Sequence, residues 1–299
     1  MNCYNNLISY EKLLFSDSPA FEMELVDDYG FVINRIVTFI SLRPIFLDKV
    51  IRLIQKYCVN PQFKEELVAN VSLSCPLIIH RLVGLGVIEL NEIRRYFNMK
   101  DHFMLCSYFR KSISGFGKNI EKMGGNENVE LFLKNDDKVI DEMIEYGFPQ
   151  GSLEYSLKFD DIDLLKKLLE DPDFFEYNGV DWNPFEWSLK PNQFDPLSIS
   201  SHFGSIRCFK YLTLCGHEIK TYHIEQAIYS GSLEIFTMCF SQSLKLIKYF
   251  CKAVEYCQYQ FVDYFLDRIS DINEKDGQRC VFLVVILHLY ILWKRVTSV

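Results

Sequence analysis

A short pattern recurs along the C-terminal half of the chain, and this recurrence determines the fold class we expect. In residues 227–236, AIYSGSLEIF, a glycine and a serine separate two apolar segments. Glycine tolerates the left-handed backbone that ends a helix and serine is a preferred N-cap, so the string predicts helix, tight turn and helix. Similar strings begin at residues 131, 156, 200, 227 and 253, which are 25, 44, 27 and 26 residues apart. Because one hairpin is too thin to bury its own apolar face, we expect these hairpins to stack as a solenoid.

The turn of each string carries residues suited to end one helix and cap the next. Counting the first residue of a string as zero, position four should be left-handed and position five should accept a hydrogen bond from an amide that opens the second helix. Position four is Asn135, Asp160, Gly204, Gly231 and Cys257, and position five is Asp136, Asp161, Ser205, Ser232 and Gln258. The first four strings fit both roles, and the fifth fits less well.

The second helix of each string has an apolar stripe at positions eight, nine and thirteen, which share one helical face. These positions are Val139, Ile140 and Ile144; Leu164, Leu165 and Leu169; Cys208, Phe209 and Thr213; Ile235, Phe236 and Phe240; and Phe261, Val262 and Leu266. Only Thr213 interrupts the stripe. The alternative interpretation is a set of ordinary amphipathic helices that match by chance.

One string resembles the opening of an ankyrin repeat. Asp195-Pro-Leu-Ser-Ile-Ser200, followed by Gly204-Ser205, has the spacing of the T-P-L-H-x-A motif and its glycine. The resemblance covers roughly residues 128–280, but the unit is shorter than the usual length of about 33 residues, which implies short or missing β-turn fingers. The long gap carries an insertion, residues 173–194, for which we expect a long loop. The chain is similar to the divergent ankyrin proteins expanded in parasitic protists.

The expected organisation is all-α, an ankyrin-like solenoid of helical hairpins preceded by a helical N-terminal region. Residues 1–127 form that region, residues 128–280 hold about five irregular repeats, and residues 281–299 are an apolar tail. Glycine and asparagine in residues 115–128 mark the boundary between the first two parts.

The resemblance implies a concave binding surface and no catalytic residues, so we expect a protein-protein interaction scaffold with a protein partner. The family's exposed positions fall on Phe159, His202, Phe203, Tyr229, Ser230, Glu255 and Tyr256, which would place an aromatic column along the repeats. Aromatic side chains are common in interface hot spots. The same rings could instead pack between neighbouring hairpins, and the sequence leaves both readings open.

Composition narrows the classes of partner and the compartment. The net charge of −8 argues against nucleic acid, and scattered cysteines without a secretory signal predict a cytoplasmic protein with reduced thiols. No residue pattern predicts a cofactor or a metal site. The apolar run 281–293 is short for a membrane span; we expect it to pack on the last hairpin or a partner, or to anchor a membrane-associated adaptor, or to be a truncated repeat.

Overall fold

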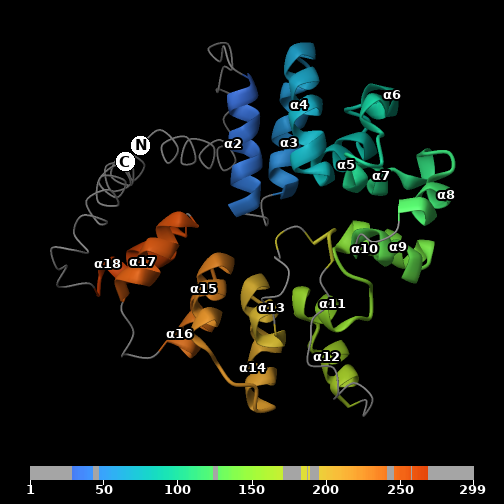
Figure 1. Ribbon diagram of the computed structural model, residues 1–299. Coiled ribbons are helices and arrows are strands. Elements are labelled where there is room, and N and C mark those ends of the chain that lie inside the picture. Colours follow the sequence, from blue (N-terminus) through green and yellow to red (C-terminus); the bar gives the residue numbers. More distant parts are fainter. Residues whose placement is uncertain are drawn as a thin grey trace. The chain divides into compact units, whose positions relative to one another are not determined.

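The computed structural model describes residues 29–42, 47–123, 127–170, 183–186, 188, 195–240, 246–256 and 258–268. Every regular element in these residues is a helix, so the predicted all-α class is confirmed for this part of the chain (Figure 1). The chain divides into two compact units, residues 1–140 and 141–299. The apolar run 281–293 lies outside the described residues, and within them no helix has the length and hydropathy needed to cross a bilayer.

Unit 1 contains short helices around small apolar clusters. Helix α4 begins with Pro61, and the Asn60 side chain caps it by accepting hydrogen bonds from two amides of the first turn. Phe103 and Phe116 belong to one buried cluster that also includes residues of α9. The elements are α2 (Tyr29–Leu42), α3 (Leu47–Tyr57), α4 (Pro61–Ser74), α5 (Pro76–Gly84), α6 (Leu90–Ile93), η3 (Arg94–Tyr96), α7 (Phe103–Tyr108), η4 (Arg110–Ser112), α8 (Phe116–Ile120), η5 (Glu121–Met123) and α9 (Glu127–Lys134).

The predicted boundary region holds helix as well as turn. Gly115 has a left-handed backbone with φ 72° and precedes α8, and η5 follows directly. The division between the two units lies further along, between Ile140 and Asp141, inside α10 (Asp137–Tyr146). The boundaries expected at residues 127 and 280 therefore stay predictions.

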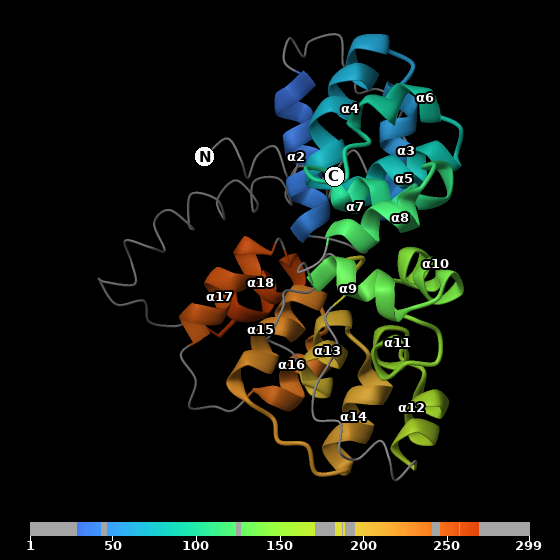
Figure 2. The same ribbon diagram turned by 45° about the vertical axis from the view of Figure 1, so that its right-hand side comes forward.

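The described part of unit 2 contains four helical hairpins. They are α11 (Leu153–Lys158) with α12 (Ile162–Leu169), α13 (Pro196–Phe203) with α14 (Ile206–Leu214), α15 (Thr221–Ser230) with α16 (Leu233–Cys239), and α17 (Leu246–Glu255) with α18 (Tyr259–Leu266). The two helices of each hairpin contact each other, and the first helices contact in the order α11, α13, α15, α17 (Figures 1 and 2). The second helices α12, α14 and α16 likewise contact in chain order.

Two consecutive helices occur at each of the five predicted strings, the first pair being α9 and α10. Cys257, at position four of the fifth string, lies outside the described residues. Position nine of the stripe is buried in every string, as Ile140, Leu165, Phe209, Phe236 and Val262. The predicted stripe is confirmed at this position.

The left-handed turns are confirmed at three strings and wrong at one. Asp160, Gly204 and Gly231 have φ of 54°, 72° and 82°. Asp160 is the only non-glycine residue in the described part with positive φ, so Asn135 is not left-handed. Its side-chain amide instead donates to Leu131 O at 2.8 Å, within the last turn of α9, which satisfies that helix end without a left-handed residue.

The predicted caps are confirmed where the side chain binds an amide of the helix that follows it. The carboxylates of Asp136 and Asp161 accept from amides three residues on, at 2.9 and 3.0 Å, and Ser232 Oγ accepts from Ile235 N at 3.3 Å. Ser205 does not cap α14, which corrects the prediction for that string. Its hydroxyl donates instead to the carbonyl of Leu157 in the preceding hairpin.

Hydrogen bonds join successive hairpins near the end of the first helix of the earlier one. Cys208 N donates to Asp160 Oδ1 at 2.9 Å, so the carboxylate at the first turn holds the start of α14. Gln258 has no side-chain cap bond, and its amide donates to Tyr229 O at 2.6 Å. This bond explains why position five of the fifth string is a longer residue than in the other strings.

Asp195 joins the first helices of two hairpins. Its carboxylate caps α13 by accepting from Ser198 N at 2.7 Å, and it accepts from the Tyr222 hydroxyl at 2.6 Å. His223 is fully buried; its Nδ1 accepts from Lys220 N at 2.9 Å, so Nε2 carries the proton and donates to Asp195 Oδ1 at 3.1 Å. Partial burial opposes ionisation of Asp195, but the donors from His223, Tyr222 and Ser198 together lower its pKa far below the ordinary value.

Candidate partner-binding face

The aromatic side chains predicted to face a partner come from the C-terminal ends of α11, α13, α15 and α17. We call Phe159, His202, Phe203, Tyr229 and Tyr256 the aromatic row. The helices that carry them contact one another in chain order, so equivalent positions of successive hairpins lie side by side. The repeat in the sequence thus becomes a row in space.

The rings of the row touch from hairpin to hairpin. His202 stacks on Tyr229, with ring centroids 4.4 Å apart and an interplanar angle of 19°. Tyr229 meets Tyr256 edge to face at 5.1 Å, and His202 meets Phe203 in the same manner at 5.0 Å. Both arrangements are favoured by the ring quadrupoles. The row is therefore continuous across the last three described hairpins.

Lys158 extends this row to the first of the four hairpins. Its Nζ lies 5.4 Å from the centroid of Phe203 and 5.7 Å from that of Phe159, so one ammonium lies over rings of two neighbouring hairpins. A cation within about 6 Å of a ring face is attracted to it. Nζ also donates to Tyr146 O at 2.7 Å, which fixes the cation at the end of α10.

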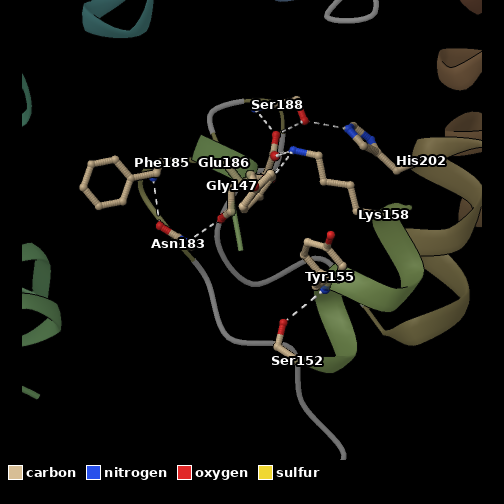
Figure 3. Close-up of polar contacts among 10 residues, drawn as sticks. Gly147, Ser152, Tyr155, Lys158, Asn183, Phe185, Glu186, Ser188 and His202 are labelled. Carbon is tan, nitrogen blue, oxygen red and sulfur yellow. Dashed lines mark hydrogen bonds and ion pairs between the residues drawn. The ribbon is translucent and has the colours of Figure 1, made fainter. Parts of the chain in front are cut away.

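A carboxylate from the insertion meets this ammonium. Lys158 Nζ donates to Glu186 Oε2, and the two side chains are 23% and 5% exposed (Figure 3). The other carboxylate oxygen, Oε1, accepts from Ser188 Oγ at 2.6 Å and from Ser188 N at 3.3 Å. A carboxylate this deeply buried requires such partners, because burial without them is costly.

Gly147 makes room for this ion pair. Its φ of +84° favours glycine, and a Cβ atom at this position would collide with the Glu186 carboxylate and lie 2.8 Å from Lys158 Nζ. The carbonyl of Gly147 accepts from Asn183 Nδ2, so the same residue also anchors the start of the segment (Figure 3). Both the backbone conformation and the close packing therefore require glycine at position 147.

The described residues of the insertion pack against the hairpins. Asn183, Phe185 and Glu186 are all buried, and Asn183 Oδ1 accepts from Phe185 N at 2.9 Å to hold a tight turn. These residues form no helix, as expected for a loop, but their side chains are buried within unit 2. We call Asn183–Glu186 together with Ser188 the internal segment.

His202 connects the internal segment to the next hairpin. Its Nε2 lies 3.1 Å from Ser188 Oγ and its Nδ1 lies 2.8 Å from Gln226 Oε1 on α15. Burial lowers the pKa of His202 to about 4; the Gln226 hydrogen bond and the Glu186 charge oppose this shift, and Lys158 adds to it. The ring is therefore neutral near pH 7: Nδ1 carries the proton and donates to Gln226 Oε1, and the unprotonated Nε2 lies beside Ser188 Oγ.

A hydroxyl, an imidazole and an amide lie in sequence, as in a catalytic triad: Ser188, His202 and Gln226. Their hydrogen bonds do not fit proton transfer. The Ser188 hydroxyl donates its proton to Glu186, away from His202. An imidazole with a pKa near 4 is also a poor general base at neutral pH. These three side chains hold the internal segment against α13 and α15.

The predicted contact residues differ in their exposure. Phe159 is 47% exposed, and Phe203, Tyr229 and Tyr256 are partly buried. His202 is 5% exposed, so it supports the row from below and offers little surface to a partner. The row is thus both packed and partly accessible, which joins the two readings that the sequence left open.

The two polar residues of that prediction add little to this surface. The Ser230 hydroxyl donates to Ala227 O at 3.0 Å and accepts from Ser232 N at 3.3 Å, so its hydrogen bonds are made within its own turn. Glu255 ends α17, and its side chain lies outside the described part of the chain. The partner contacts proposed for both residues stay predictions.

Sequence reasoning missed the residues that hold the row from behind. Glu186, Ser188 and Asn183 lie in the insertion, and Gln226 is a mid-helix residue with no turn or cap signal. The one available signal was Asn183-Pro-Phe-Glu186, an Asx-type turn opening inside an aromatic stretch, which marks an ordered turn. Their partners are 28 to 36 residues away in the sequence for Glu186 and Asn183, beyond any local pattern.

Among the described residues, no group of three or more histidine, cysteine, aspartate or glutamate side chains is arranged to hold a metal ion. No family model, no curated protein and no solved structure gives a significant match to this chain.

Proposed function

We propose that this chain is a non-catalytic, cytoplasmic scaffold in which an ankyrin-like solenoid binds a protein partner through the aromatic row. The observation that carries the proposal is the unbroken series of ring and cation contacts from Phe159 through Lys158 to Tyr256. A row of this kind presents aromatic area on rigid helices, which is the composition of interface hot spots.

The solenoid part of the proposal has separate support. Successive hairpins contact through their first helices, and the first three of the four also through their second helices. The side chains of Ser205 and Gln258 each bind a carbonyl near the end of the first helix of the preceding hairpin. Each hairpin then depends on its neighbour, as in repeat proteins. The resemblance of residues 195–205 to an ankyrin opening supports an ankyrin-like solenoid.

Affinity capture tests the partner-binding role. The wild-type chain is compared with a variant carrying Phe203→Ala, Tyr229→Ala and Tyr256→Ala, and the melting of both is recorded because these rings also pack. Leu214→Ala with Ile219→Ala is the matched control, since both side chains are exposed and neither belongs to the row.

We expect the row variant to lose specific partners that the wild type and the control variant both retain. An identical set of captured proteins for all three chains, with the row variant folded, would refute binding through the row. Loss of the same partners from the control variant would point to a different surface.

A further inference from the structure

We propose that the internal segment is a built-in occupant of the aromatic row, and that the partner presents a similar acidic peptide, whose carboxylate takes the place of Glu186. This inference rests on the proposed partner-binding function and names the chemistry of the partner. It commits to a peptide ligand of this class, which displaces Glu186 from Lys158.

The internal segment is bound in the way a short peptide is bound. Side chains make its contacts with the hairpins: Glu186 with Lys158, Ser188 with His202, and Asn183 with the carbonyl of Gly147 (Figure 3). Phe185 is 3% exposed, and its ring points away from Lys158 and His202 (Figure 3). One buried ring, one buried carboxylate and a few directed hydrogen bonds are the usual elements of peptide recognition.

Lys158 makes this surface selective for a carboxylate. Without Glu186 its ammonium would keep the Tyr146 carbonyl as hydrogen-bond acceptor and the rings of Phe159 and Phe203 as neighbours, but it would have no anion there. A partly buried ammonium in this state is strongly stabilised by an incoming carboxylate. Charge complementarity therefore favours an acidic ligand over a neutral or basic one.

The row also continues past the internal segment. Phe159 is 47% exposed although it lies beside the same ammonium, and Tyr229 and Tyr256 are only partly buried. A partner longer than the internal segment would gain these surfaces in addition to the sites it replaces. The additional contacts would allow an external peptide to compete with the internal segment.

Fluorescence polarisation of a labelled peptide with the sequence of residues 183–188, NPFEWS, tests the inference on the full chain. The tethered segment competes at an effective concentration in the millimolar range, so the wild type should bind the peptide weakly. Phe185→Ala with Glu186→Gln should release the site and tighten binding at least about tenfold. A peptide with glutamine in place of its glutamate should bind this variant no more tightly than it binds the wild type.

Two further variants in the Phe185→Ala, Glu186→Gln background locate the site. Lys158→Met should weaken peptide binding at least about tenfold, because it removes the cation that holds the carboxylate. Lys210→Met is the matched control; this lysine pairs with Glu234 outside the row, and its loss should leave binding unchanged. Equal binding by the wild type and the released variant, or no loss with Lys158→Met, would overturn the inference.

Circular dichroism establishes whether the double variant folds. If it does not, Glu186→Gln alone keeps the shape of the segment and should still tighten binding about threefold or more by weakening the ion pair; no tightening would overturn the inference. If partners are captured through the row but the peptide arms fail, this inference falls and the scaffold function stands. If the peptide arms succeed and capture is indifferent to the row, the scaffold function falls.

Discussion

Replacing His202 with glutamine should remove a large part of the acid sensitivity of unit 2. The folded-state pKa of this histidine is lowered from 6.5 to about 4, chiefly by burial. Because the folded value is below the unfolded one, the contribution to stability is complete above pH 6.5 and is lost as the pH falls toward 4. Each pKa unit is worth about 1.4 kcal/mol, so the full effect is about 3 kcal/mol.

Between pH 7 and pH 4.5 the wild type should lose about 2 kcal/mol through this residue. Glutamine keeps a donor and an acceptor but does not titrate, so His202→Gln should be less stable at pH 7 and much less dependent on pH. Urea unfolding followed by circular dichroism at several pH values gives the difference between the two chains.

The pKa of His80 in unit 1 is also lowered by burial, with contributions from two arginines. His80→Gln therefore serves as a comparison. Its effect on the pH dependence of stability should add to that of His202→Gln. An equal loss of free energy in the wild type and in His202→Gln over this range would show that the ring is not held neutral by the fold. The anchoring role given to it above would then be wrong.

Three further predictions concern turns and caps. Asp161→Ala and Ser232→Ala should each lower the free energy of unfolding by about 1 kcal/mol, since each side chain accepts from an amide that opens a helix; chemical denaturation measures this, and unchanged stability in both would exclude the capping role. Gly231→Ala should lower the melting temperature more than Gly86→Ala. Both glycines have positive φ, but only at Gly231 would a Cβ meet a side-chain oxygen, at 2.9 Å; equal melting of the two variants would argue against this close approach. Asp195→Asn should flatten the stability profile below about pH 4, because a carboxylate with a lowered pKa contributes stability that is lost as it is protonated; unfolding at pH 6 and pH 3 tests it, and a wild-type loss preserved in the variant would contradict it.

Local chemistry was readable from the sequence. Gly204, Gly231 and Asp160 adopt the left-handed turns that their residue types favour, and Asp161 and Ser232 cap the helices that follow them. These roles depend on backbone within three residues, which one string contains in full. The helical class followed from the same repetition.

Roles that depend on a neighbouring hairpin were not readable. Ser205 has the residue type of a cap, but the carbonyl of Leu157 lies within its reach and takes its hydroxyl. His202 occupies an exposed position of the predicted repeat, but the insertion covers it through Ser188. In both cases a contact between residues distant in the sequence overrides a local preference, and no pattern in one string reports it.

Side-chain bonds from the second and the fourth described hairpins to the hairpin before each of them give that part of unit 2 a fixed order. Gln258 reaches Tyr229 O with a long amide, whereas Ser205 reaches Leu157 O with a short hydroxyl, so the two junctions are chemically different. Removing or exchanging a hairpin would set a long side chain against a junction shaped for a short one. The hairpins of unit 2 are therefore not interchangeable. A consensus repeat inserted at either of these two junctions would require new residues on both of its sides.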